Sequence, residues 1–125
     1  MSRSVVDLER VICRVSDLEM HGGARAFTIG GAAAGDWPLR GLLVRVGAEI
    51  RGYVNDCPHA HHPLNLLPHR FLTADCALIV CASHGALFEK LTGMCVAGPC
   101  AGAYLRSIEL QIEDGFVLLA ASPTA

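Results

Sequence analysis

Hydrophobic residues recur along the chain in short runs of four to six positions, divided by glycine, aspartate and other turn residues. Runs of this length, rich in valine, isoleucine and leucine, are typical of β-strands. The pattern therefore predicts an all-β protein in which helix is the minority state, limited to a turn within 4–14 or 17–21. The predicted strands are Val11–Val15, Ala26–Ile29, Leu42–Val46, Glu49–Val54, Ala77–Cys81, Ile108–Ile112 and Phe116–Ala120.

Two of the turns predict hairpins. Gly47-Ala48 separates two consecutive predicted strands, and Asp114-Gly115 precedes the last one. Glycine suits such turns because it accepts positive φ without strain. A third glycine-rich run, Gly30–Asp36, lacks the Gly-Lys-Ser/Thr ending of a phosphate loop and the dinucleotide fingerprint. This run is predicted to be a flexible connection.

Length and composition restrict the function classes. A chain of 125 residues is the size of one domain, and 52% hydrophobic against 18% charged residues indicates a packed globular core. The net charge is −2 and the basic residues are scattered, so neither nucleic acid nor an anionic membrane surface is an expected partner. No apolar run reaches the roughly 20 residues that cross a membrane. We expect a small molecule or a protein as partner.

The expected cell compartment indicates the chemical state of the cysteines. Asp7 and Glu9 lie where a secretory signal would carry its apolar stretch, so we expect a cytoplasmic protein. In that compartment six cysteines are expected to be thiols, metal ligands or redox groups rather than a disulfide framework.

Two short motifs combine cysteine with histidine. Cys57-Pro58-His59 and Cys81-Ala82-Ser83-His84 each supply one thiolate and one imidazole. Zinc would take all four on one tetrahedral ion. A [2Fe–2S] cluster would take the two sulfurs on one iron and the two nitrogens on the other. Zinc knuckles commonly pair two cysteines or two histidines, whereas each motif here contains one of each. The mixed motifs therefore favour the [2Fe–2S] cluster. A Cys₂His₂ zinc module is the alternative.

At these motifs the chain resembles the Rieske [2Fe–2S] family, from about Leu42 to the C-terminus. Cys57-x-His59 and Cys81-x-x-His84-Gly85 resemble the two ligand loops. The run Phe88 to Gly93 resembles the Phe-acid-x-x-Thr-Gly hairpin of Rieske ferredoxins, and Gly98-Pro99 resembles the proline loop that covers the cluster. The gap between His59 and Cys81 holds 21 residues, several more than in typical ferredoxins, which predicts an enlarged first loop around 65–69.

The resemblance implies a fold, a cofactor and a function. The fold would be a single Rieske domain over 1–125, an antiparallel β-sandwich with a cluster-binding subdomain at about 56–102 that holds two ligand loops and a proline loop. One [2Fe–2S] cluster per chain would be held by Cys57, His59, Cys81 and His84. The protein would be a soluble ferredoxin, no catalyst by itself, that carries single electrons from a flavin-dependent ferredoxin reductase to a terminal oxygenase. The alternative is an accessory or redox-sensing subunit of the nitrite reductase small-subunit type.

The other cysteines and histidines have no assigned role. Cys76, Cys95 and Cys100 are expected to be buried small hydrophobes or idle thiols, and Cys13 to serve packing. A disulfide between Cys95 and Cys100 is disfavoured in the cytoplasm. The family register makes His59 the ligand and leaves His61 and His62 as exposed loop residues. The residues Leu64, Leu66, Leu67 and Pro68 would form either a loop core or an apolar rim for transient docking.

Overall fold

The computed structural model describes residues 11–19, 21–29, 39–58, 63–65, 67, 69–83 and 85–120. The run Gly30–Asp36 and residues 4–10 of the alternative helical turn at 4–14 lie outside this set, whereas residues 11–14 of that turn are a strand. The described residues form ten β-strands and two short 3₁₀ helices, η1 (Val15–Glu19) and η2 (His21–Gly23). The prediction of an all-β chain with little helix is confirmed.

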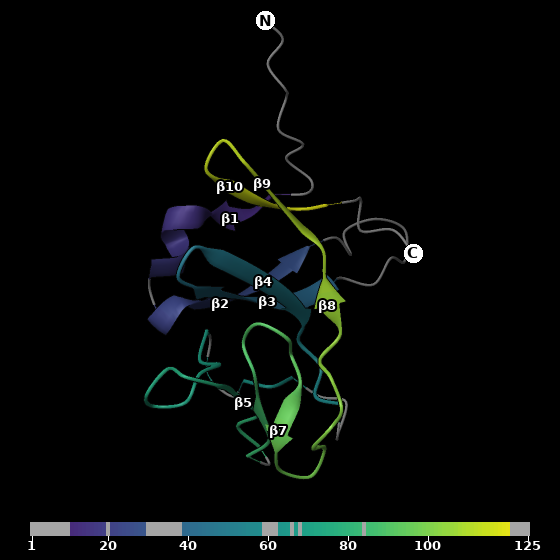
Figure 1. The fold of residues 1–125 in the computed structure, drawn as a ribbon. Coiled ribbons are helices and arrows are strands. Elements are labelled where there is room, and N and C mark those ends of the chain that lie inside the picture. The colour runs from purple at the N-terminus through teal and green to yellow at the C-terminus, as the bar shows by residue number, and fades with distance from the viewer. Residues whose placement is uncertain are drawn as a thin grey trace, which may run out of the picture.

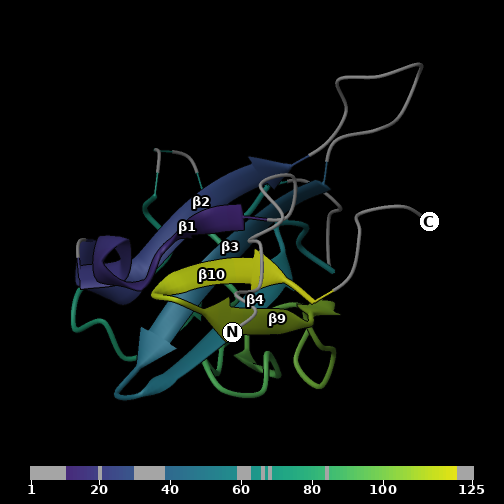
Figure 2. The same cartoon turned by 90° about the horizontal axis from the view of Figure 1, so that it is seen from above.

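The strands form three antiparallel sheets that lie one above the other (Figures 1 and 2). The upper sheet has the order β1-β10-β9, the middle sheet β2-β3-β4-β8 and the lower sheet β5-β6-β7. The bounds are β1 Val11–Arg14, β2 Ala24–Ile29, β3 Leu39–Val46, β4 Glu49–Val54, β5 Ile79–Val80, β6 Leu87–Phe88, β7 Cys95–Ala97, β8 Ser107–Ile108, β9 Leu110–Glu113 and β10 Phe116–Leu119.

The middle sheet is covered on both faces. On β3, Leu42 and Val44 face one buried cluster and Leu43 faces the other, because successive side chains of a strand point to opposite sides. The second cluster joins Leu43 to Phe27 of β2 and Val117 of β10, and so packs the upper sheet onto the middle one. This double burial explains why the centre of β3, at 42–44, is a continuous apolar run rather than an alternating one.

Both predicted hairpins are present. In the β3–β4 pair Val46 lies opposite Glu49, and the two-residue turn between them begins with Gly47 at φ 60°. In the β9–β10 pair the turn residues are Asp114 and Gly115, at φ 53° and 80°. Positive φ at these positions gives a two-residue turn the twist that its strands need, which is why glycine and aspartate occupy them.

Other predicted strands differ from the structure. The run Ile108–Ile112 is split: β8 pairs with β4 in the middle sheet, whereas β9 pairs with β10 in the upper sheet. The run Ala77–Cys81 contains only the two-residue strand β5. Strands β6 and β7 were not predicted, because two or three residues are too few to show a period.

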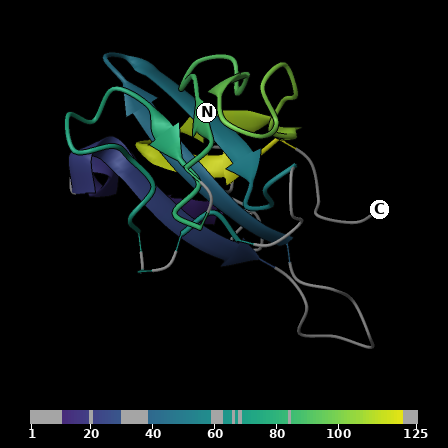
Figure 3. The same cartoon turned by 90° about the horizontal axis from the view of Figure 1, so that it is seen from below.

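The segment between β4 and β8 leaves the middle sheet and returns to it at neighbouring positions. Tyr53 of β4 lies opposite Ser107 of β8, and the Val54 amide donates a hydrogen bond to the Arg106 carbonyl over 2.8 Å. The segment carries the lower sheet and the loops around it, which lie in front of the middle sheet in the view from below (Figure 3). Both cysteines of the two motifs belong to it. No helix in the described ranges has the length and apolar character that a membrane span needs.

Candidate metal centre

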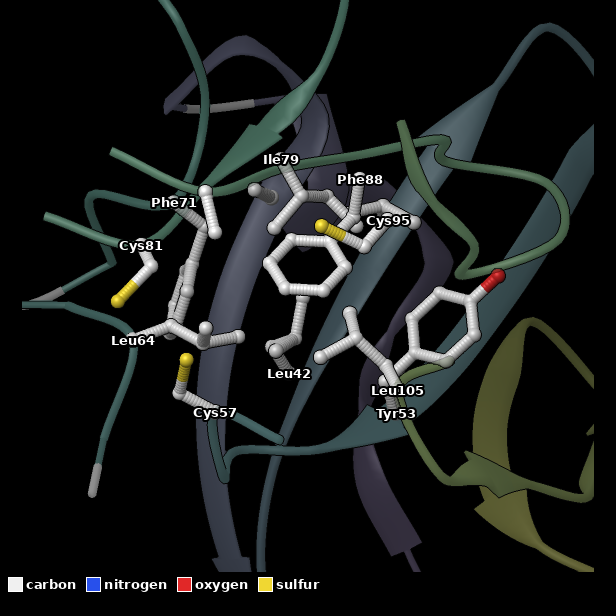
Figure 4. Packing of buried hydrophobic residues seen from close by; sticks show 13 residues of the cluster. Leu42, Tyr53, Cys57, Leu64, Phe71, Ile79, Cys81, Phe88, Cys95 and Leu105 are labelled. Atoms are coloured by element: carbon white, nitrogen blue, oxygen red, sulfur yellow. The ribbon is translucent and has the colours of Figure 1, made fainter. Parts of the chain in front are cut away.

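The two motif cysteines lie in one buried cluster. Cys57 follows β4 and Cys81 follows β5, and the structure gives each side chain an exposed fraction of 0%. Figure 4 shows their sulfur atoms turned toward the same space at one end of this cluster, beside Leu64 and Phe71. Two distant segments thus bring two sulfur donors together.

The second motif is held by a tight turn. The Cys81 amide donates to the Ala86 carbonyl, and the Gly85 amide donates back to the Cys81 carbonyl, each over 2.8 Å. Gly85 has a φ of 74°, a left-handed conformation that favours glycine. The turn therefore fixes the backbone on both sides of His84, which itself lies outside the described residues.

The first motif is held by an asparagine that sequence reasoning missed. The Asn55 side-chain oxygen accepts the Leu64 amide over 2.8 Å, and its amide nitrogen donates to the Asn65 side-chain oxygen over 2.9 Å. Asn55 thus ties the two ends of the segment that contains Cys57 and His59. Asn55 stands two residues before Cys57, but its partners lie on the far side of the loop, so no local pattern marks it.

The two motif loops are also joined to each other. The Ala82 amide, next to Cys81, donates to the Leu64 carbonyl over 2.8 Å. Leu64 itself is fully buried, whereas Leu67 is 57% exposed. Of the four apolar residues predicted as a core or a rim, Leu64 therefore serves the core and Leu67 lies at the surface; Leu66 and Pro68 lie outside the described residues.

The proline loop packs directly on the second motif loop. Gly98 has a φ of 101°, and a Cβ at this position would stand 2.7 Å from the Ala86 Cα. The backbone of the loop can approach Ala86 this closely only because Gly98 has no side chain. The base of the loop is closed by two hydrogen bonds, from the Cys95 amide to the Ala103 carbonyl and from the Gly102 amide to the Cys95 carbonyl.

The Phe88 to Gly93 run forms a turn attached to the middle sheet. The Gly93 amide donates to the Glu89 carbonyl over 2.9 Å, and the Thr92 hydroxyl donates to the Glu89 carboxylate over 2.7 Å. The Tyr53 hydroxyl donates to the Lys90 carbonyl over 2.7 Å. The acidic, threonine and glycine positions of this motif therefore position the loop that follows them.

The remaining cysteines are free thiols in the structure. Cys13 is buried, and burial raises the pKa of its thiol to about 11. Cys95 is 1% exposed and Cys100 is half-buried, whereas Cys76 is exposed. Cys13 and Cys95 are buried as expected of packing residues, whereas the exposed Cys76 fits only the alternative of an idle thiol.

The described part of the chain contains half of the expected ligand set. Within the described ranges no three histidine, cysteine, aspartate or glutamate side chains come together. The described donors are the sulfurs of Cys57 and Cys81, a pair that suits one iron of a [2Fe–2S] cluster. His59, His61, His62 and His84 lie outside the described residues.

The comparison with protein families decides between the metals. Residues 9–112 match the model of the Rieske [2Fe-2S] domain. The chain belongs to the Rieske family. A Rieske domain binds a [2Fe–2S] cluster, and the two buried cysteine sulfurs of this chain fit that cofactor. A search of curated proteins gives no match.

Solved structures share the Rieske fold of this chain. A chain of the complex of reduced oxygenase and oxidised ferredoxin in carbazole 1,9a-dioxygenase has 27% identity and a TM-score of 0.66, covering 88% of this chain and 99% of that chain. The ferredoxin of carbazole 1,9a-dioxygenase from Nocardioides aromaticivorans IC177 has 24% identity and a TM-score of 0.66, with 88% and 94% covered. The Sphingomonas yanoikuyae B1 ferredoxin has 22% identity and a TM-score of 0.63, with 89% and 96% covered.

Terminal oxygenases contain the same fold as one part of a longer chain. The terminal oxygenase of carbazole 1,9a-dioxygenase from Nocardioides aromaticivorans IC177 is similar with 21% identity and a TM-score of 0.66. The match covers 93% of this chain but 31% of the oxygenase. This Rieske chain therefore matches whole ferredoxins but only a fraction of that oxygenase.

The Asn55 clamp leads to a first prediction. Asn55→Ala removes the acceptor of the Leu64 amide, so we expect the free energy of unfolding to fall by about 1–3 kcal/mol and the cluster to be lost faster. Asn55→Asp keeps an oxygen that accepts the Leu64 amide, so its free energy of unfolding should fall clearly less than that of Asn55→Ala. Chemical denaturation and the decay of cluster absorbance measure both effects. Equal behaviour of the two variants would show that the hydrogen bond to Leu64 does not hold the loop.

His69 leads to a second prediction. The Ala26 amide of β2 donates to His69 Nδ1 over 3.0 Å, which attaches the loop between the two motif cysteines to the edge of the middle sheet. His69 has a φ of 60°, which asparagine and glycine also accept. We expect His69→Gly to speed hydrogen exchange of the Ala26 amide and to cost about 1–3 kcal/mol of stability. His69→Asn keeps an acceptor, so hydrogen exchange of the Ala26 amide should stay slow in that variant. Fast exchange of this amide in both variants would contradict the hydrogen bond from Ala26 to His69.

Proposed function

We propose that this Rieske protein is a ferredoxin that carries single electrons from a flavin-dependent reductase to a terminal oxygenase. Its one [2Fe–2S] cluster would be held by Cys57, His59, Cys81 and His84. The observation that carries this proposal is the length of the match. This chain covers 99% of a chain in the oxygenase–ferredoxin complex. The oxygenase of the Nocardioides system, in contrast, has more than two thirds of its chain outside the match.

The residues of this chain would hold and shield the cofactor. When bound, a [2Fe–2S] cluster accepts and releases one electron. Cys57 and Cys81 supply sulfur from the buried side, where their full burial excludes water. The hydrogen bonds of Asn55 and Gly85 keep the two loops in place when the charge changes, so little of the protein has to move. A fixed donor set keeps the reorganisation that accompanies electron transfer small.

The ferredoxin assignment also supports an oxygenase as partner. One of the similar structures is a complex of reduced oxygenase and oxidised ferredoxin. In this chain Leu67 and Val96 are 57% and 42% exposed. Leu67 lies in the loop between the two motif cysteines, and Val96 lies in strand β7, next to the proline loop. Exposed apolar side chains suit a transient protein contact. The reductase and a cytoplasmic location remain part of the proposal.

An electron-transfer assay tests the function. Holoprotein is mixed with NADH, a flavin-dependent ferredoxin reductase of a Rieske oxygenase system, and cytochrome c as a one-electron acceptor. We expect cytochrome c reduction to rise in proportion to the added holoprotein and to stop with a Cys81→Ser variant. Holoprotein with an intact cluster that adds nothing to the rate of the reductase alone would contradict the carrier function and favour an accessory subunit.

A further inference from the structure

Two thiols of the proline loop lie against each other. The Cys100 thiol donates to the Cys95 Sγ over 3.3 Å, and the Cys95 thiol donates to the Ala97 carbonyl over 3.1 Å. A disulfide needs the two sulfurs at about 2.05 Å, so they would have to approach by roughly 1.3 Å. This approach would come from rotation about the Cα–Cβ bonds of the two side chains.

The backbone keeps this pair together. Besides the two bonds that close the base of the loop at Cys95, the Ala103 amide donates to the Cys100 carbonyl over 2.9 Å. The two cysteines therefore belong to one closed hairpin, and a reaction between their sulfurs is intramolecular. Such a reaction has a large advantage over one with a second molecule in solution.

The two thiols differ in access. Cys100 is half-buried and can be reached by a small reagent, whereas Cys95 is 1% exposed and packs in the same buried cluster as Cys57. Burial, the hydrogen bond to Cys95 and the charges of the Cys95 and Cys57 sulfurs raise the pKa of the Cys100 thiol, which keeps the pair in the dithiol form at neutral pH and slows its attack on a disulfide. The accessible thiol would react first and the buried one second.

We propose that Cys95 and Cys100 are a reversible dithiol–disulfide site, separate from the cluster ligands, that reacts with low-molecular-weight disulfides such as oxidised glutathione. Cys100 loses its proton and its sulfur attacks one sulfur of glutathione disulfide, which breaks that S–S bond and releases one glutathione. Cys95 then loses its proton, attacks the Cys100 sulfur and releases the second glutathione. Two protein thiols are oxidised and one glutathione disulfide is reduced. An excess of glutathione reverses both steps.

The disulfide would brace the loop that lies on the second motif loop. Between the two cysteines stands Gly98, whose backbone contacts Ala86. A covalent link would tie the exposed end of this loop to a residue in the buried core. The site needs no electron-transfer function, because the thiols and the hairpin are present whether or not the protein serves an oxygenase.

A titration with glutathione tests the proposal. Holoprotein is equilibrated anaerobically with graded ratios of oxidised to reduced glutathione, quenched in acid, alkylated and analysed by peptide mass spectrometry. We expect the peptide that holds Cys95 and Cys100 to lose two hydrogens, fully reversibly with dithiothreitol, as the ratio rises. The exposed Cys76 is the internal control, because without a second thiol beside it, it should form only a mixed disulfide.

Single variants separate the steps. In Cys95→Ser, Cys100 should stop as a mixed disulfide with glutathione, whereas in Cys100→Ser the buried Cys95 should stay a thiol. Both cysteines staying alkylatable at every ratio, or Cys100 of the wild type ending as a mixed disulfide, would overturn the proposal. Cluster absorbance recorded on the same samples keeps a failure of this site distinct from a failure to bind the cluster.

Discussion

Cys81→Ser is expected to leave the protein without its [2Fe–2S] cluster, while Cys76→Ser keeps it. Cys81 is fully buried and its sulfur shares the space into which Cys57 points (Figure 4), whereas Cys76 is exposed and does not belong to the buried cluster that holds Cys57 and Cys81. Loss of one thiolate leaves the cluster with three protein ligands, and a serine hydroxyl replaces a sulfur poorly at iron. Iron and acid-labile sulfide per chain, with visible absorption, measure the result.

The same two variants can contradict the prediction that Cys81 is a cluster ligand. An intact cluster in Cys81→Ser, or an equal loss in Cys76→Ser, would contradict the assignment of Cys81 as a ligand. The same comparison applies to His59 and His84, which stay predictions from the motifs. Replacing either with alanine should also remove the cluster, whereas alanine at His61 or His62 should keep it.

Gly98→Ala is expected to destabilise the protein and to release the cluster, while Gly102→Ala is expected to be milder. Both glycines have positive φ, of 101° and 92°, so alanine is strained at either position. Only at Gly98 would the new Cβ meet another atom, the Ala86 Cα at 2.7 Å; at Gly102 there is open space. The close atom belongs to the backbone of the second motif loop, so the proline loop has to move.

The difference between the two glycine variants isolates the steric effect. Overpacking typically costs about 1–3 kcal/mol, and we expect this extra loss of unfolding free energy in Gly98→Ala relative to Gly102→Ala. The half-life of the cluster absorbance in air should shorten in Gly98→Ala alone, because the displaced loop no longer packs on Ala86. Equal stability and equal half-life in both variants would show that the proline loop does not lie where the structure places it.

Local patterns predicted the parts of the fold that are locally determined. The β3–β4 and β9–β10 hairpins follow from Gly47 and from Asp114-Gly115, because each turn needs positive φ at known positions. The motif cysteines were found because their spacing to histidine is short and fixed by the metal. The structure brings Cys57 and Cys81 together in one buried cluster, as the motifs require.

Long-range contacts could not be predicted in this way. The split of Ile108–Ile112 depends on two different partner strands, and one apolar run gives no sign of a change of sheet. The Asn55 bonds span nine and ten residues and the His69 bond to Ala26 spans 43, so neither single polar residue belongs to a local sequence pattern. The contact of the Cys95 and Cys100 thiols depends on the closed hairpin around them.

The most direct test of the account is electron paramagnetic resonance of anaerobically purified protein before and after dithionite, with iron, sulfide and zinc measured on the same sample. The account predicts two irons and two sulfides per chain, and a signal that appears on reduction with the low average g-value of a cluster with mixed histidine and cysteine ligands. One zinc per chain and no signal in either state would contradict it.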